Sequence, residues 1–571
     1  MMRLPMVDRE LTLRALLTGV LLGALLTPSN IYSGLKIGWS FNMSIIALLV
    51  GFSLWQGLAG RFGLPGWGQL ESNITQTTAS SAASIVSSGL VAPIPAFTLI
   101  TGQQLALLPL TAWVFSVSFL GIWVAWYLRP SLILRAGLRF PEGVATLATL
   151  EQIYGHGREA LQRLAVLGGG ALLAALVKLA DALLWRLPRW APGPALERLT
   201  FTFEPSLLLL GFGGIIGLRV GLSLLLGALL AWGALAPWLL ARGLVRLPAD
   251  ASGPQFAVLV EWLLWPGVSL MVCATLSALA LRLWREGRSG RVAAAPSAGR
   301  GAAVGPALGL ALASALVVAL QIGLFGIAPL MALLTIPFAL LLATVAARVV
   351  GATGIPPIGA IGQLSQLGFG VIAPGQVAIN LMSANTAGGA AGQCTDLLND
   401  FKVGHALGAS PSRQALAQCA GILIGSLVGV LAYRALIPDP QAMLVTPEWP
   451  APAVATWKAV AEALTGGLGA LSADIRLALL GGALAGLGLG LLEVFARPPL
   501  ARWLPSPAAL GLAFIIPASV SLTMVFGALL AWLIVARWRS LGERFVIVAA
   551  AGLVAGESIA GVGISFWQLL G

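Results

Sequence analysis

The chain has 571 residues, of which 58% are hydrophobic and only 9% are charged, and its formal net charge is +12. Soluble globular chains carry about 25% charged residues, so this composition excludes a water-soluble domain, and its high hydrophobicity excludes a disordered chain. The apolar runs are continuous, which disfavours a β-barrel and predicts an all-α polytopic membrane protein.

Apolar runs long enough to span a bilayer, about 20 residues each, follow one another along the chain. The first begins close to Arg3, Arg9 and Arg14 and leads into no signal-cleavage pattern, so we expect a cytoplasmic N-terminus. Two more polar stretches, 70–92 and 376–398, are long enough to be membrane-embedded helices that pack through small residues. The other predicted spans are 11–29, 43–59, 105–127, 163–186, 206–240, 256–283, 304–325, 329–348, 414–436, 476–494, 508–535 and 545–570.

The positive charge has a membrane explanation. Arginines lie at the ends of apolar runs and in the connectors, where loop asymmetry and lipid headgroups favour them. The sequence shows no stripe of basic and aromatic residues, so we expect no nucleic-acid partner. The most hydrophilic connector, 282–300, has five arginines against one acid, which indicates a cytoplasmic linker.

Weak internal similarities recur at nearly one spacing. The clearest is SLLLGALLAW at 223–232, which resembles TMVFGALLAW at 523–532. Two further matches, one before and one after it in the chain, fall in the same order in both halves, at offsets of 291 to 296 residues. We therefore predict two tandem repeats, 1–285 and 303–571, separated by a basic linker at 286–302.

Two corresponding segments of these repeats are interrupted. The run 206–240 contains several glycines and Arg219, and the run 508–535 is broken at 517–519. Broken membrane helices in matching positions are a pointer to a transporter binding site. Arg219 is therefore a candidate ligand for a substrate carboxylate, although an ordinary interfacial arginine is the alternative.

The N-terminal third places polar residues where lipid depth makes them costly. Asn30, Tyr32 and Lys36 form one group, whose alternative is a helix end with a snorkelling lysine. Asn73, Gln76 and Thr77 share a helical face with the spacing i, i+3, i+4, which suits hydrogen bonding to a peptide-like amide. The alternative for that face is polar helix–helix packing.

Three further groups carry charge. Arg139 and Glu142 flank a helix-breaking proline and are candidate gating residues, with a loop cap as the alternative. Asp396 and Asp400 lie four residues apart on one helical face, where like charges repel and one carboxyl is driven to keep a proton. That property suits a proton carrier, while neutralisation by Lys402 or His405 in a structural cluster is the alternative. The remaining carboxylates considered for proton coupling are Glu71 and Glu557.

Signatures of an enzyme or a metalloprotein are absent from the sequence. It has no phosphate-binding loop, no HExxH and no GxSxG pattern. Three scattered cysteines and two histidines do not suggest a disulfide framework or a zinc site. We expect no cofactor and no metal.

Several stretches resemble the oligopeptide transporter superfamily, which includes the yellow stripe-like transporters. They cover nearly the whole chain and are NIYSGLKIGW (30–39), NITQTTASSAAS (73–84), RFPEGVAT (139–146), GIPPIGAIGQLSQLGFG (354–370), DLLNDFKVGHALGASPSRQ (396–414) and AGESIAGV (555–562). The resemblance, to a bacterial member, implies about sixteen transmembrane or re-entrant helices in two eight-helix repeats. It also implies proton-coupled uptake of small peptides or peptide-like metal chelates.

The sequence thus predicts a secondary transporter of the cell membrane with a hydrated crevice between its repeats. Its expected partners are a peptide-like substrate, protons and the lipid bilayer, and no oligomeric state is indicated. A passive channel and an intramembrane enzyme are the alternative functions. The predicted substrate-binding residues are Asn30, Tyr32, Lys36, Asn73, Gln76, Thr77, Gln363, Asn385 and Arg219. The predicted proton-coupling residues are Asp396, Asp400, Glu557 and Glu71, and the predicted gating residues are Arg139, Glu142 and Lys402.

Overall fold

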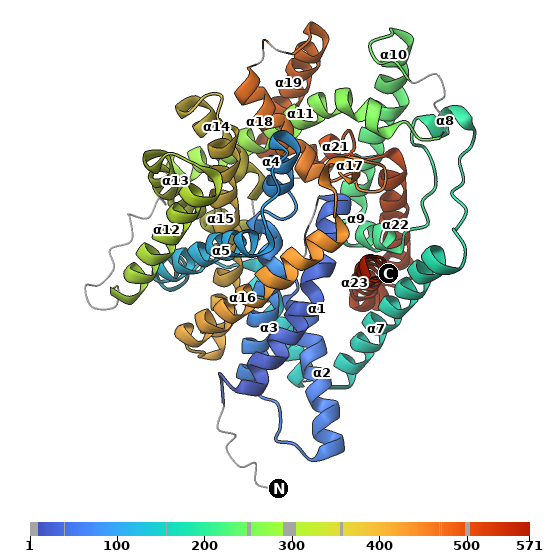
Figure 1. Ribbon diagram of the computed structural model, residues 1–571. Helices are drawn as coiled ribbons and strands as arrows, with labels where there is room; N and C mark the ends of the chain where they lie inside the picture. The colour runs from blue at the N-terminus through green and yellow to red at the C-terminus, as the bar shows by residue number, and fades with distance from the viewer. Residues whose placement is uncertain are drawn as a thin grey trace.

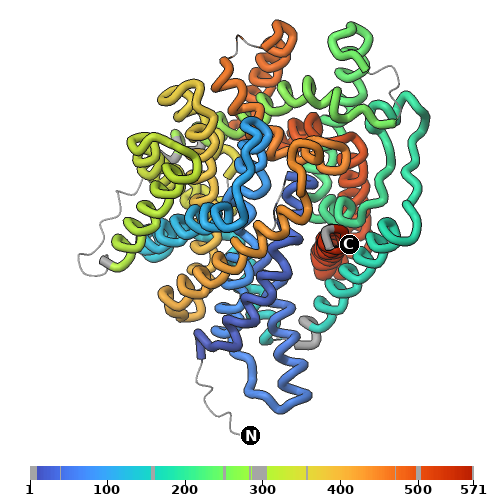
Figure 2. Tube along the Cα trace, viewed as in Figure 1, coloured from blue at the N-terminus to red at the C-terminus, as the bar shows by residue number. Residues whose placement is uncertain are grey.

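A computed structural model shows helices crossing one another through the whole molecule (Figures 1 and 2). Within the part of the chain that it describes, one isolated bridge between Trp190 and Phe203 is the only β pairing. The all-α prediction is confirmed. The predicted linker lies outside the described residues from position 289 onward. The residues described are 9–38, 40, 42–155, 157–247, 253–288, 304–354, 358–467, 469, 471–496 and 503–570.

The first half of the chain forms eleven α-helices and four short segments of other helical type within its described residues. The α-helices are α1 (Leu13–Ile37), α2 (Ser44–Phe62), α3 (Gln69–Ala83), α4 (Pro93–Thr101), α5 (Leu107–Arg129), α6 (Pro141–Gly155), α7 (Gly157–Leu179), α8 (Pro194–Arg198), α9 (Leu207–Ala228), α10 (Ala236–Ala241) and α11 (Phe256–Arg288). The short segments are the 3₁₀ helix η1 (Ser84–Ser88) and the π-helical turns η2 (Pro130–Arg135), η3 (Ala180–Leu184) and η4 (Leu229–Leu235).

The described residues of the second half are also helical. Its helices are α12 (Val304–Phe325), α13 (Pro329–Thr353), α14 (Ile358–Ile372), α15 (Val377–Leu407), α16 (Pro411–Leu436), α17 (Pro440–Met443), α18 (Pro452–Gly466), α19 (Ala473–Phe495), α21 (Pro507–Leu512), α22 (Ala518–Arg537) and α23 (Arg539–Leu570). The predicted polar stretch 376–398 lies on α15, and the stretch 70–92 forms α3 and η1 before a turn at 89–92.

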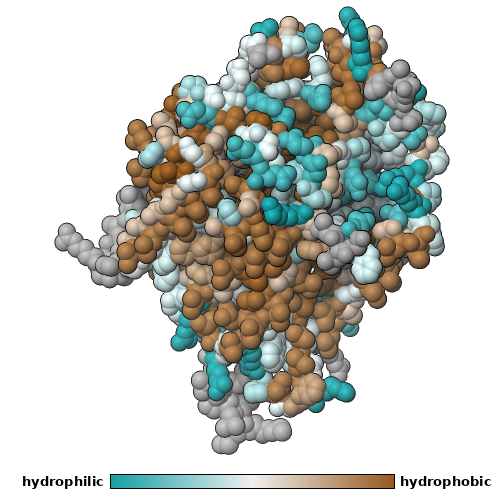
Figure 3. Space-filling model, viewed as in Figure 1, coloured by the Kyte–Doolittle hydropathy of each residue, from teal (hydrophilic) through white to brown (hydrophobic). Residues whose placement is uncertain are grey.

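Thirteen helical stretches of the described residues are long and apolar enough to cross a membrane. Hydrophobic surface spreads over the middle of the face seen in Figure 3, as lipid contact requires. α15 has 31 residues but is too polar to count among the thirteen. Protein, not lipid, surrounds it, because α5, α13 and α14 pack closely along its length. The predicted number of sixteen helices is not tested by this count.

The two halves interlock through close helix pairs. α7 packs on α23, α11 packs on α19, and α9 packs on α22. α7 and α19 occupy corresponding places in the predicted repeats, as do α11 and α23. The first two pairings are therefore reciprocal, as a two-fold relation between repeats would give. This reciprocity supports the duplication, which stays a prediction.

Glycine permits a close approach between α16 and α3, and this contact can be tested by substitution. A Cβ added to Gly421 would lie 1.9 Å from Ser81 Oγ and 2.3 Å from the carbonyl oxygen of Thr78. We expect Gly421→Ala to push the helices apart and to lower the free energy of unfolding by about 1–3 kcal/mol. The measurement is the melting temperature of the purified protein in detergent.

The matched control for Gly421 is Gly57→Ala. Gly57 lies within α2, and an added Cβ would meet no atom within 4 Å. Alanine favours a helix more than glycine does, so this variant should melt no lower than the unchanged protein. Equal melting temperatures for the two alanine variants would contradict the tight α16–α3 contact.

Both segments predicted to be interrupted are broken in the structure. α9 contains Gly217 with φ 80° and ψ 170°, outside the helical region. α21 ends at Leu512, and α22 begins only at Ala518. The sequence prediction of two breaks is confirmed.

Other parts of the protein occupy the second break. The indole N–H of Trp232 donates to the carbonyl oxygens of Ala513 and Ile516, both at 2.9 Å. Thr200 accepts from the backbone N–H groups of Ala518 and Ser519 at 2.8 and 2.9 Å. These four backbone groups are paired by protein, so the break does not offer them to a solute in this conformation.

Candidate functional site

The candidate site lies where α3, α15 and α16 cross. α3 carries polar side chains along most of its length, and α1, α2, α15 and α16 enclose it in the protein interior. The Gln76 amide donates to Asn73 Oδ1 at 3.2 Å, to Thr77 Oγ1 at 3.1 Å and to Asp400 Oδ1 at 3.1 Å. Four of the predicted site residues are thus brought together. Asn73, Gln76 and Thr77 are fully buried, and Asp400 is 3% exposed.

α16 adds two residues that were not predicted. Gln414 donates to the backbone carbonyl of Asp400 at 2.9 Å. Gln418, one turn further along, is fully buried beside the Asp400 carboxyl, and neither of its amide atoms has a hydrogen-bond partner. Together with Gln76 they surround Asp400 with amide groups from two helices. The apolar run 414–436 concealed them, although their spacing of four places both on one helical face.

Several polar atoms of this network have no hydrogen-bond partner. A buried polar group left without a partner costs about 1–3 kcal/mol, so such atoms call for an explanation. Bridging water or a bound solute would supply the missing partners. These residues are buried from bulk solvent, and several of their polar atoms lack partners. The hydrated crevice between the repeats stays a prediction. The unpartnered atoms are Asn73 Nδ2, Gln76 Oε1, Asp400 Oδ2, and both side-chain polar atoms of Gln418.

Glu142 joins three elements near the site. Its carboxylate accepts from the Asn42 amide at 3.2 Å and from the Asn399 amide, on α15, at 3.1 Å. The backbone N–H of Gly143 returns a bond to Asn399 Oδ1 at 3.3 Å. Burial raises the pKa of Glu142, and the hydrogen bond from Asn42 opposes this shift. This arrangement ties α6, which is outside the thirteen apolar spans, to the turn of α15 next to Asp400.

The other charged residues predicted around α15 are more exposed. Asp396 and Lys402 are partly exposed, and Arg139 is exposed. Asp396 lies one helical turn before Asp400, as its spacing predicts. Their predicted roles stay predictions.

Lys36 lies at the end of α1, against the segment that follows α17. Its ammonium donates to the carbonyl oxygen of Glu448 and lies 5.0 Å from the centre of the Trp449 ring. Tyr32 packs edge-on against Trp449, with ring centres 5.3 Å apart. Asn30 is almost fully buried and donates to the Ala83 carbonyl at 3.1 Å, between α1 and the last residue of α3. Asn30, Tyr32 and Lys36 therefore contact different parts of the protein along α1 and do not form one binding site.

Glu557 is buried, and each of its carboxylate oxygens accepts a hydrogen bond. One carboxylate oxygen accepts from Ser206 Oγ at 2.9 Å and the other from the backbone N–H of Leu208 at 2.7 Å. An anion is favourable at a helix N-terminus, where backbone N–H groups lack partners. Glu557 thus ties α23 to the start of α9. Proton coupling through it stays a prediction.

Glu71 is held by an ion pair at the opposite end of α3 from η1. Arg14 donates to both of its oxygens, with Nε to Oε1 at 2.7 Å, and Thr12 donates at 2.6 Å. The Arg14 guanidinium lies 5.2 Å from the ring centres of Trp55 and Trp67, which are stacked on each other. These contacts make Glu71 an anchor between α1 and α3. Proton coupling through it stays a prediction.

Three predicted substrate ligands lie apart from Asp400. Arg219 is exposed and donates to the Leu504 carbonyl at 2.9 Å, which fits the interfacial alternative and not a ligand at the α3 network. Asn385 donates to the Ser88 carbonyl at 3.3 Å, and its own oxygen has no partner. Gln363 is 6% exposed on α14. No described cluster of three His, Cys, Asp or Glu side chains is arranged to hold a metal ion.

The family model and the relatives that match this chain point to the same protein family. The family model described as OPT oligopeptide transporter protein matches residues 10–290 and 304–568. A putative oligopeptide transporter of Haemophilus influenzae is 24% identical, with 94% of this chain and 92% of the relative aligned. The putative oligopeptide transporter YGL114W of Saccharomyces cerevisiae is 25% identical over 77% of this chain and 80% of its own length.

A plant relative extends the range of named substrates. The probable metal-nicotianamine transporter YSL10 of Oryza sativa is 23% identical, with 96% of this chain and 89% of the relative aligned. Members of this family are membrane transporters and not enzymes, so the intramembrane enzyme is excluded. The family match runs from before the start of α1 almost to the end of α23. The chain belongs to the OPT oligopeptide transporter family.

Proposed function

We propose that this protein is a secondary active transporter that carries small oligopeptides or peptide-like metal chelates by alternating access, coupled to protons. One observation carries the proposal: the incompletely hydrogen-bonded network of Asp400, Gln76 and Gln418, buried where three helices cross. Polar groups at this depth are costly and are retained where a pathway uses them. The conformation described here is then a closed one, and opening exposes these groups to solute.

The chemistry of the network favours an amide-bearing solute. Asn73, Gln76, Gln414 and Gln418 each carry a donor and an acceptor, which match the N–H and C=O groups of a peptide bond. The relatives are named as oligopeptide or metal-nicotianamine transporters, which agrees with a peptide-like substrate. A metal ion would enter as part of the chelate and not as a resident cofactor.

Asp400 is the proposed proton carrier. It is the carboxylate of the network, and one of its oxygens has no partner. A carboxyl in this position can exchange a proton when the network opens and can stay neutral when it closes. Asp396, one turn away, is the second candidate.

We further propose that the protein lies in the cell membrane with its N-terminus and linker in the cytoplasm. The arginines near the first helix and in the connector 282–300 support this orientation through the positive-inside rule. Accessibility of a cysteine placed in each of these segments to a membrane-impermeant reagent would test it.

Uptake by proteoliposomes tests the function. The purified full chain is reconstituted and given an inward proton gradient together with labelled di- and tripeptides and iron or copper chelates of peptide-like ligands. We expect at least one compound to accumulate above its external concentration, and a protonophore should abolish that accumulation. Equilibration without accumulation, insensitive to the protonophore, would establish a passive facilitator instead.

A further inference from the structure

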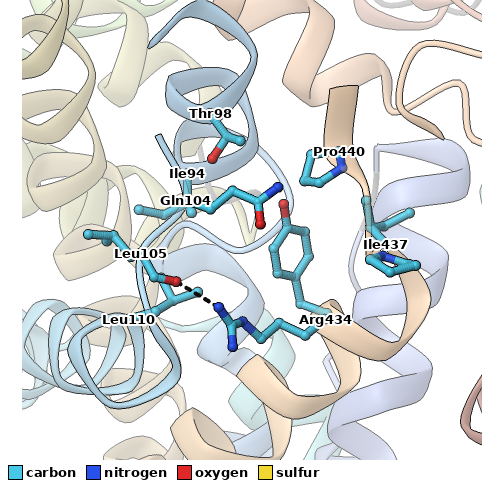
Figure 4. A pocket seen from close by; sticks show the side chains of 10 residues that line it. Ile94, Thr98, Gln104, Leu105, Leu110, Arg434, Ile437 and Pro440 are labelled. Carbon is cyan, nitrogen blue, oxygen red and sulfur yellow. Dashed lines mark hydrogen bonds between the residues drawn. The ribbon is translucent and has the colours of Figure 1, made fainter. Parts of the chain in front are cut away.

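A cavity lies apart from the α3–α15–α16 network, between the α4–α5 loop and the end of α16 (Figure 4). Its volume is about 270 Å³. None of its lining residues belongs to the network around Asp400. It sits near α4 and α17, which contact each other in the part of the molecule far from the N-terminus (Figure 1).

Two lining groups can recognise an anion. Arg434, in the last turn of α16, is exposed and donates one N–H to the Leu105 carbonyl at 3.0 Å, drawn as a dashed line in Figure 4. A guanidinium carries five N–H donors, so this bond leaves most of its donor capacity for a ligand. Gln104 reaches into the same space from the α4–α5 loop and adds an amide (Figure 4).

Tyr433 supplies the independent observation. Its side chain lines the cavity and is 5% exposed, yet its hydroxyl has no hydrogen-bond partner. A buried hydroxyl without a partner is costly, and a ligand oxygen in the cavity would satisfy it. Asp439, the acid closest in sequence to these residues, accepts hydrogen bonds through Oδ1 from the backbone N–H groups of Gln441 and Ala442 at the start of α17. It is not among the residues that line the cavity.

The walls and the position point to the kind of ligand. Leu110, Ile437 and Pro440 line the cavity with apolar surface. α5 and α16, whose ends form the site, are both long and apolar enough to cross a membrane. The ends of such helices are where headgroups meet hydrocarbon. A guanidinium binds phosphate through paired N–H donors, and apolar walls suit the carbons that a headgroup bears.

We propose that this cavity binds a phosphate-bearing headgroup of the size of glycerol phosphate, held by Arg434 and Tyr433. The same chemistry is offered by an anionic phospholipid and by a free phosphate monoester. The volume is slightly below the roughly 300 Å³ at which pockets for drug-sized ligands begin, which suits a headgroup better than a long peptide. The inference does not depend on the proposed transport cycle.

Ligand-induced stabilisation tests the site with the full chain in neutral detergent. The probes are dihexanoylphosphatidylglycerol, glycerol 1-phosphate and, without phosphate, dihexanoylglycerol. We expect a saturable rise in melting temperature with a phosphate-bearing probe and none with dihexanoylglycerol. Binding only of dihexanoylphosphatidylglycerol identifies a lipid site, and equal binding of glycerol 1-phosphate identifies a site for free monoesters.

Two variants and a matched control test whether the ligand-induced rise in melting temperature comes from this cavity. Arg434→Gln should weaken binding about tenfold or more, because a charge-assisted hydrogen bond is lost. Tyr433→Phe should weaken it several-fold and leave the fold intact, since its hydroxyl has no partner to lose. Arg537→Gln removes an exposed arginine from the last turn of α22 and should bind as the unchanged protein does. Absence of a phosphate-dependent rise, or equal affinity in Arg434→Gln and the unchanged protein, would overturn the proposal.

Discussion

Asp400→Asn should abolish the accumulation of substrate under a proton gradient while the protein stays folded. Asparagine keeps the shape of the side chain and can still pair with the Gln76 amide, which bonds Asp400 Oδ1 at 3.1 Å. It cannot carry a proton. An ionisable group at membrane depth costs about 2.5–3.5 kcal/mol, so the neutral amide should not destabilise the helix crossing. Initial uptake in proteoliposomes should fall roughly tenfold or more, to the level of passive equilibration.

The design separates coupling from binding. Asp474→Asn is the matched control, because Asp474 is an exposed aspartate in the first turn of α19. Gln76→Leu removes the amide instead of the carboxyl and should weaken substrate binding as well as uptake. If Asp400→Asn still accumulates substrate against its gradient, the proton carrier is not Asp400.

The polar face of α3 could be predicted from spacing alone. Asn73, Gln76 and Thr77 follow the period of a helix, and no lipid-facing helix tolerates such a face. What this face meets could not be predicted, because Asp400 lies 324 residues further along the chain and no local pattern joins the two. Gln418 was missed for a related reason: hydropathy averaged over α16 hides a polar residue whose partners come from other helices.

Ionisable residues in apolar runs were harder to assign. Their partners are remote in sequence, so a local pattern could not show which of these residues only link helices together. Glu557 receives the backbone N–H of Leu208, 349 residues away, at the start of a helix. Arg219 instead reaches the Leu504 carbonyl near the surface. The sequence predicted a helix break at 517–519, beside the observed gap between α21 and α22, but its closure by the Trp232 indole could not be predicted.

Arg14→Gln should be among the most destabilising single substitutions in the chain. The Glu71 side chain is 2% exposed, and Arg14 is its cationic partner in the ion pair. Removing the cation leaves a buried carboxylate with only the hydroxyl of Thr12 and the backbone N–H of Gly68 as donors. Breaking a buried pair in this way typically costs about 3–5 kcal/mol. The melting temperature in detergent, read by tryptophan fluorescence, measures the loss.

A double-mutant cycle identifies the origin of that loss. Arg14→Gln combined with Glu71→Gln should recover much of the stability, because a neutral amide replaces the stranded charge. Arg539→Gln is the control, since its pair with Glu543 is exposed on both sides and should contribute nothing measurable. If the double variant is no more stable than Arg14→Gln, the contribution of Arg14 comes from its stacking on Trp55 and Trp67 instead of from the ion pair. In either case α1 and α3 are held together at the end next to the N-terminus, so a movement that opens the network around Asp400 has to carry the two helices as one unit.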